Sequence, residues 1–117
     1  MTVLLVEDEQ MVAILLEDMV TSLGCETTMV AHNVAAALNA IAVTRPDLAV
    51  LDVSLGAELV YPVAEKLGSL RVPFVFTTGF GRNAITLEWA GRPVVQKPFN
   101  IAALEAALKT ALQAKSS

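Results

Sequence analysis

Two short apolar runs of this 117-residue chain end in carboxylates, and this feature strongly limits the folds that the chain can adopt. The run 48–51 ends at Asp52, and the run 3–6 ends at the acidic triplet 7–9. A strand that is apolar along its whole length is typical of a parallel sheet, because helices cover both faces of such a sheet. A carboxylate that follows such a strand directly is held at the rim of the sheet. The two acidic positions therefore meet only if their strands are neighbours.

The pattern of apolar residues, turn residues and helix caps divides the chain into five strand–helix repeats. The predicted strands span about residues 2–6, 26–30, 48–52, 73–77 and 93–96. The predicted helices span about residues 10–23, 33–43, 58–68, 82–90 and 100–114. This alternation predicts an α/β fold in which helices cover both faces of a five-stranded parallel sheet. The length fits a single domain over residues 1–117.

Local signals support several of these boundaries. The first helix carries an apolar stripe with the 3.6-residue period of a helix, formed by Met11, Ile14, Leu15, Met19 and Leu23. We expect Gly24 to end that helix and Asn33 to cap the second one. On the last helix, Glu105 and Lys109 are spaced to pair on the exposed side. Its apolar face is predicted to hold Ile101, Leu104, Leu108 and Leu112.

Composition and charge argue against several classes of protein. The net charge is −4 and the basic residues form no cluster, which argues against nucleic acid as a direct partner. No apolar stretch reaches the roughly 18 residues of a membrane span, and the N-terminus lacks the features of a signal peptide. The single Cys25 cannot form an internal disulfide, which suits a reducing compartment. We therefore expect a cytoplasmic protein that contacts neither nucleic acid nor a membrane.

Polar residues follow four of the predicted strands and should lie together. They are Glu7 and Asp8 after the first strand, Asp52 on the third, Thr77-Thr78-Gly79 on the fourth and Lys97-Pro98-Phe99 on the fifth. In a parallel sheet all four groups lie on one edge, and ligands bind at that edge where the strand order reverses. Carboxylates gathered there repel one another unless a divalent cation joins them, and Mg²⁺ prefers such oxygen ligands.

The chemistry that these residue types suggest is phosphoryl transfer to a carboxylate, with Asp52 as the nucleophile. The ammonium of Lys97 would neutralise charge on the phosphoryl oxygens, and the hydroxyl of Thr78 would donate to one of them. The expected Mg²⁺ ligands are the carboxylates of Asp8 and Asp52 and the carbonyl of Ser54, with Glu7 nearby through water.

These motifs, in this order and over the whole chain, resemble the receiver domain of two-component response regulators, the CheY-like family. The resemblance implies a flavodoxin/CheY-like sheet of order 2-1-3-4-5, with no output domain in this chain. It implies that a histidine kinase or a phosphotransfer protein passes a phosphoryl group from histidine to Asp52. Such a receiver catalyses only its own phosphorylation and dephosphorylation, and signals by binding a downstream protein as a monomer or a phosphorylation-dependent dimer.

The segment 76–81 is also similar to the "FAT GUY" motif of single-domain receivers in bacterial stress signalling, with Thr77 in place of its Ala and Phe80 in place of its Tyr. Two features depart from the family pattern. Gly56-Ala57-Glu58 replaces the usual Pro and Gly after the phosphorylated aspartate, so we expect a remodelled loop. Val94 stands where the family has its switch aromatic, and Phe80 is the candidate replacement.

Three other functions stay open at this point. One is a phosphate sink, which drains a kinase without a downstream target and is distinguished by the lifetime of its phosphoryl group. An aspartate-nucleophile phosphatase of the haloacid dehalogenase class would carry Asp-x-Asp after its first strand, where this chain has Glu7-Asp8-Glu9. A pseudo-receiver is never phosphorylated and would not need the set of site residues that is intact here, namely Asp8, Asp52, Thr78 and Lys97.

Overall fold

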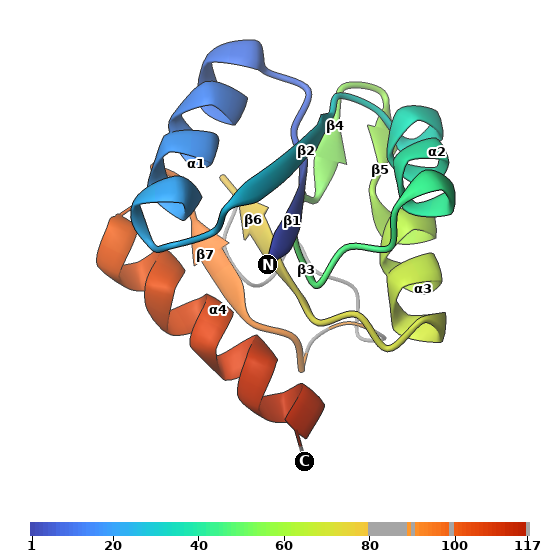
Figure 1. Cartoon of the computed structure of the whole chain (residues 1–117). Helices are drawn as coiled ribbons and strands as arrows, with labels where there is room; N and C mark the ends of the chain where they lie inside the picture. The colour runs from blue at the N-terminus through green and yellow to red at the C-terminus, as the bar shows by residue number, and fades with distance from the viewer. Residues whose placement is uncertain (80–88, 90, 99, 117) are drawn as a thin grey trace.

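The computed structural model describes residues 1–79, 89, 91–98 and 100–116 and contains a five-stranded parallel sheet (Figure 1). The strand order is β2-β1-β3-β6-β7, and every neighbouring pair is parallel. The strands are β1 Thr2–Val6, β2 Thr27–Ala31, β3 Leu48–Asp52, β6 Phe74–Thr78 and β7 Val94–Gln96. In order of the main strands this is the predicted 2-1-3-4-5 arrangement. The predicted α/β fold class is therefore confirmed.

In the described part of the chain, helices lie on both faces of the sheet (Figure 1). The helices are α1 Gln10–Ser22, α2 Val34–Val43, α3 Tyr61–Ser69 and α4 Ile101–Ser116. Alternate residues of β1 supply the two cores, because successive side chains of a strand point to opposite faces. Val3 and Leu5 pack with α1 and α4, whereas Leu4 and Val6 pack with α2 and α3. Burial on both faces is the reason that β1, β3 and β6 read as apolar runs.

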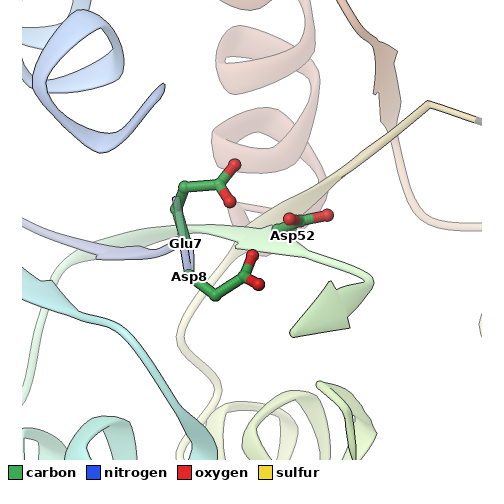
Figure 2. Close-up of side chains that lie close together, drawn as sticks. All are labelled: Glu7, Asp8 and Asp52. Carbon is green, nitrogen blue, oxygen red and sulfur yellow. The ribbon is translucent and has the colours of Figure 1, made fainter. Parts of the chain in front are cut away.

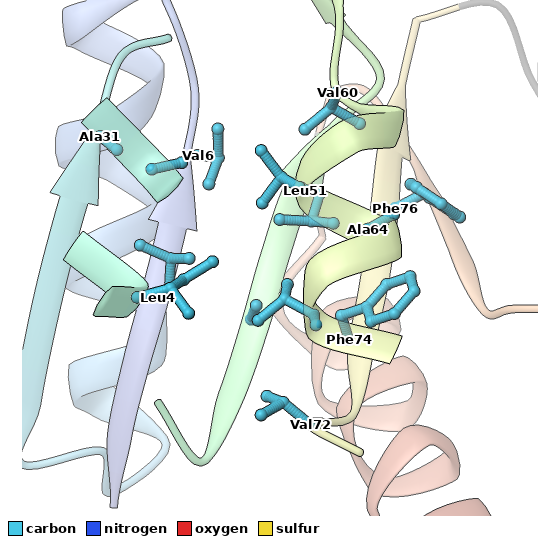
Figure 3. Packing of buried hydrophobic residues seen from close by; sticks show 14 of the residues in the cluster. Leu4, Val6, Ala31, Leu51, Val60, Ala64, Val72, Phe74 and Phe76 are labelled. Atoms are coloured by element: carbon cyan, nitrogen blue, oxygen red, sulfur yellow. The ribbon is translucent and has the colours of Figure 1, made fainter. Parts of the chain in front are cut away.

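The two cores differ in their side chains. The core under α1 and α4 contains aliphatic residues and Cys25 among the described residues. The core under α2 and α3 is built around Phe74 and Phe76, whose rings meet edge to face at 5.4 Å, with Trp89 and Tyr61 against them. Figure 3 shows how Phe74 and Phe76 lie beside Ala64 of α3. Edge-to-face ring packing of this kind adds to the stabilisation from burial.

Most predicted boundaries agree with the structure to within one or two residues. Asn33 caps α2 by accepting a hydrogen bond from the backbone N–H of Ala36 at 2.8 Å. Gly24 follows α1 with φ +99°. Lys109 and Glu105 pair across 3.9 Å on α4. The helix predicted at 82–90 lies mostly outside the described residues.

Only part of the apolar stripe predicted for α1 packs against the core, where Met19 and Leu23 lie partly buried. Ala13, Leu16 and Val20 are buried against the sheet, whereas Met11 is 80% exposed and Ile14 and Leu15 are about half exposed. The stripe therefore leaves large apolar side chains on the surface beside the carboxyl end of β1. No helix in the described part of the chain has the length and apolar character needed to cross a membrane.

The prediction of a helix starting at residue 58 is wrong. Ser54–Leu55 (β4) and Glu58–Leu59 (β5) form a two-stranded antiparallel hairpin, and α3 starts at Tyr61. Gly56 occupies the turn with φ +64°, a conformation that glycine adopts without steric cost. A two-residue loop with Gly at its first position is a known hairpin signal, and it precedes this helix. The segment 56–58, at which the chain departs from the family pattern, lies in this hairpin.

Candidate functional site

The strand order brings the predicted acidic residues together. The chain leaves β1 toward β2 on one side and returns to β3 on the other, so the connections diverge between β1 and β3. β1 pairs with β3 through Val6 and Leu51, so the residues that follow, Glu7 and Asp52, lie side by side at the carboxyl edge. This is the type of position at which open α/β sheets bind ligands.

Three carboxylates gather at this edge (Figure 2). Glu7, Asp8 and Asp52 each offer an oxygen atom, and these atoms lie within 4.8 Å of one another. Glu7 and Asp52 are buried, with 0% and 5% exposure, while Asp8 is exposed. An all-oxygen set that is exposed on one side fits Mg²⁺, which keeps several waters and takes only one or two carboxylates directly.

Lys97 places its ammonium between the two buried carboxylates. Its Nζ atom lies 2.8 Å from Oε1 of Glu7 and 3.0 Å from Oδ2 of Asp52. The backbone fixes this position, because the N–H of Lys97 donates to the carbonyl of Thr78 at 2.9 Å and so extends the β6–β7 pairing. The Lys97–Pro98 peptide bond is cis. The ammonium therefore neutralises part of the negative charge of the cluster.

Burial changes the proton affinity of this pair. Desolvation raises the pKa of Glu7 to about 7, assisted by the neighbouring Asp52 and opposed by the hydrogen bond from Lys97. Burial acts to lower the pKa of Lys97, but the hydrogen bonds to Glu7 and Asp52 outweigh it and the net pKa is raised. Lys97 is thus held as a cation, and burial favours the protonated form of Glu7.

A cavity of about 350 Å³ opens above the carboxylates. Thr78, which is buried, and Ser54 lie in its wall, and the backbone N–H of Ser54 donates to Oδ1 of Asp52 at 3.4 Å. The described lining residues are Asp8, Glu9, Asp52, Ser54, Gly56, Thr78, Gly79 and Lys97. Glu7 is absent from this lining and lies beneath the cavity, where it holds the ammonium of Lys97. The arrangement offers an oxygen nucleophile, a cation and a hydroxyl to an anionic group in the cavity.

Sequence reasoning missed Glu58 as a residue that shapes the site. Its Oε1 atom accepts a hydrogen bond from the backbone N–H of Val34 at 2.8 Å, at the first turn of α2. The contact ties the hairpin to that helix, and Gly56 of the same hairpin lines the cavity. A carboxylate is favoured near a helix N-terminus by the helix dipole. In the sequence, the feature that could have pointed to this contact was the glycine at position 56 followed two residues later by a glutamate.

Of the two residues considered for the aromatic switch position, Val94 is among the described residues and Phe80 is not. Val94 pairs with Phe76 in the sheet and packs against the aromatic core beneath α3. The position of the family's aromatic is therefore held by a half-buried aliphatic side chain. Phe80, the candidate replacement, and Phe99 lie outside the described residues.

The family model of the response regulator receiver domain matches residues 3–109, and the chain therefore belongs to this family. Among solved structures, SdrG from Sphingomonas melonis Fr1 is 38% identical, with 95% of each chain covered and a TM-score of 0.85. The receiver domain of PhyR from Erythrobacter litoralis is 29% identical, covering 99% of this chain and 92% of that one, with a TM-score of 0.86. The anti-anti-sigma factor PhyR from Bartonella quintana is 30% identical over 98% of this chain and 49% of that one, with a TM-score of 0.83. The comparison with curated proteins gives no significant match.

Proposed function

We propose that this receiver accepts a phosphoryl group on Asp52 from the phosphohistidine of a histidine kinase or a phosphotransfer protein. The supporting observation is the contact of Asp52 with Lys97 at 3.0 Å beside Asp8, at the mouth of a cavity large enough for a phosphoryl group. A carboxylate oxygen of Asp52 attacks phosphorus, the phosphorus–nitrogen bond to histidine breaks, and its electron pair stays on the imidazole. The product is an acyl phosphate.

The residues of this chain hold the donor group in place. Asp8 and Asp52, with the carbonyl of Ser54, would hold Mg²⁺, which when bound supplies positive charge to the phosphoryl oxygens. Lys97 supplies a second positive charge, and its contact with Glu7 holds the ammonium in place. Thr78 donates its hydroxyl to a phosphoryl oxygen. Preorganised charges of this kind act where charge develops in the transition state.

The exposed end of α1 fits the docking side for the phosphoryl donor. Met11, Ile14 and Leu15 are apolar and exposed, and Leu15 also lines a cavity of about 350 Å³ with Val12, Lys97 and Pro98. That cavity lies beside the phosphoryl site because both contain Lys97. A partner that covers this surface would shield the transfer from water. This role explains why α1 carries large apolar side chains that the core does not use.

The output is proposed to pass through Thr78 and Lys97 to the β7–α4 surface, where a downstream protein or a second copy binds. A hydrogen bond to a charged group is worth about 1.5–3 kcal/mol, comparable to typical allosteric coupling energies of about 1–3 kcal/mol. The similarity to SdrG and to PhyR receivers supports a place in the FAT GUY group of single-domain receivers, acting in the bacterial cytoplasm.

The proposal is tested by the mass of the intact protein after treatment with a small phosphodonor and Mg²⁺. The native chain should gain one phosphoryl mass, and Asp52→Asn should gain none. Asp18→Asn is the matched control, because Asp18 is an exposed aspartate of α1 away from the cavity. A phosphoryl mass that persists in Asp52→Asn would refute the assignment. If the added phosphoryl mass is lost by hydrolysis within seconds, the result would favour the phosphate sink instead.

A further inference from the structure

A second pair of cavities lies at the opposite end of the sheet from the phosphoryl site. They have volumes of about 450 and 320 Å³ and share Pro73, Arg92, Ala111 and Ala114 in their walls, so they form one groove. The groove runs along the amino ends of β6 and β7, between the last turn of α3 and the last turns of α4, near the C-terminus in Figure 1. The first cavity also includes Gly68, Arg71 and Val72. This set shares no residue with the phosphoryl cavity.

Arg92 presents a fixed positive charge in this groove. Its guanidinium carbon lies 4.7 Å from the centre of the Phe74 ring and 5.8 Å from the ring of Trp89. Stacking on aromatic faces is favourable for arginine and limits its conformations. Among the described residues Arg92 forms no ion pair with a carboxylate. The charge is therefore preorganised, and its hydrogen-bonding edge is not used by a carboxylate of the described chain.

Arg71 occupies a backbone conformation that normally selects glycine. Its φ is +59°, and its N–H donates to the carbonyl of Gly68 at 3.1 Å while the N–H of Val72 donates to Leu67 at 2.9 Å. This is the Schellman ending of a helix, in which glycine is the usual residue. Residues other than glycine rarely adopt this conformation, because their Cβ atom comes too close to the following carbonyl oxygen.

The ending of α1 provides an internal comparison. There the same pattern of hydrogen bonds is closed by Gly24, with Cys25 donating to Val20 at 3.1 Å and Gly24 to Thr21 at 3.0 Å. The chain thus uses glycine at one Schellman ending and accepts a strained arginine at the other. Strain at a residue whose side chain lines a cavity points to a use for that side chain.

We propose that this groove binds an acidic segment of a partner protein, with its carboxylates paired to Arg71 and Arg92. The described lining residues include these two arginines and no Asp or Glu, in a chain whose net charge is −4. A third guanidinium lies close by, because Arg45 donates to the carbonyl of Leu70, next to Arg71. Guanidinium groups bind carboxylates through two parallel hydrogen bonds. Val72, Pro73 and Ala111 offer apolar contact to the same segment.

This binding is separate from the proposed phosphoryl transfer. The groove lies at the amino ends of β6 and β7, whereas Thr78 ends β6 and Lys97 follows β7, so a segment bound in the groove leaves the phosphoryl cavity open. Binding is therefore expected in the native chain and in Asp52→Asn alike. A failure of phosphorylation would leave this prediction unchanged, and a failure of peptide binding would leave phosphorylation unchanged.

The test uses an array of labelled eight-residue peptides that carry two Asp or Glu residues among small apolar residues, with Lys-substituted peptides as the comparison. The best acidic peptide should shift the backbone NMR signals of Gly68, Arg71, Arg92 and Ala111 in the native chain, and raised salt should weaken it. Arg71→Gly should reduce affinity at least tenfold while raising the midpoint of thermal unfolding, because it removes the strain. Arg92→Lys should also weaken binding, because lysine lacks the planar fork.

Lys109→Gln is the matched control, because it removes an exposed cation of α4 outside the groove and should leave affinity unchanged. The proposal is overturned if no acidic peptide shifts these signals, if the shifts fall at the α1 surface, or if Arg71→Gly binds as well as the native chain. Shifts produced equally by inorganic phosphate, or self-association of the chain through these residues, would also overturn it, because they would identify a different occupant.

Discussion

The two ends of the sheet differ in whether their cationic side chains are paired with carboxylates of the described chain. At the carboxyl end, Glu7 and Asp52 enclose the ammonium of Lys97, so the cation is satisfied inside the chain. At the amino end, Arg71 and Arg92 line a groove that contributes no carboxylate from its described residues. The carboxyl end holds its cation against two buried carboxylates, which suits a reaction that must be organised before the donor arrives. The amino end presents its charges outward, which suits recognition.

The largest expected effect comes from removing the cation at each end in turn. Lys97→Met should reduce the rate of phosphorylation by a small phosphodonor by about 10²–10³-fold, the usual loss when one preorganised charge donor is removed from a reaction site. Arg92→Met likewise removes a long cationic side chain, but at the amino end, and should leave the rate of phosphorylation unchanged. Phosphorylation followed by intact mass against time measures both. Equal phosphorylation rates for the two variants would show that the cations at the two ends do not differ in this role.

A second effect follows from the raised pKa of Glu7, about 7 against an ordinary 4.5. Between these values the folded chain keeps a proton on Glu7 that the unfolded chain releases. Stability from this group is therefore fully present below pH 4.5 and falls as pH rises to about 7, with a slope of up to about 1.4 kcal/mol per pH unit.

The measurement is urea unfolding of the native chain and of Glu7→Gln across this range, with a chelator present so that metal does not contribute. Glutamine cannot ionise, so the stability of the variant relative to the native chain should rise with pH through the window. A difference between the two proteins that does not change with pH would show that Lys97 keeps Glu7 ionised throughout.

A third effect concerns the metal. Asp8 is the exposed member of the carboxylate cluster, and Asp8→Asn should weaken Mg²⁺ binding by about tenfold or more, equivalent to about 1.4 kcal/mol. Because a ligand stabilises the state that binds it, the rise in thermal midpoint with added Mg²⁺ should shrink in the variant. Asp18→Asn again serves as the control, since it lies on α1 outside the cluster. An unchanged Mg²⁺ response would remove Asp8 from the ligand set.

The sequence was sufficient for the sheet and for the residues of the carboxyl end. Apolar runs that end in Asp52 and in the triplet 7–9 identify buried parallel strands, and parallel strands place their carboxyl ends on one edge. Strand order and polar termini together therefore predict which side chains meet. The geometry agrees for Glu7, Asp8, Asp52 and Lys97, which lie in one cluster.

The α1 surface and the groove of the amino end could not be predicted in the same way. The stripe of large residues on α1 has a helical period, but the sheet accepts the smaller Ala13 with Leu16 and Val20, and the larger Met11 stays outside. Periodicity reports which residues share a face and does not report which face meets the sheet. The groove depends on Arg71 in a left-handed conformation, for which the residue type gives no signal. The residues that line the groove come from segments far apart in the sequence.

The smallest expected effect concerns the hairpin that follows Asp52, and it separates a structural contact from a role in the reaction. Glu58→Ala removes the acceptor for the N–H of Val34, at a cost to stability of about 1 kcal/mol. Since the same hairpin carries Gly56 into the wall of the cavity, the variant should also weaken Mg²⁺ binding by a few-fold. Glu58→Gln keeps an oxygen acceptor and should restore both properties, because the contact to the backbone N–H needs the acceptor more than the charge. Urea unfolding and Mg²⁺ titration on the two variants provide the measurement. If Glu58→Ala lowers stability and leaves Mg²⁺ affinity as in the native chain, the contact of Glu58 with α2 has only a structural role, and the shape of the phosphoryl cavity does not depend on it.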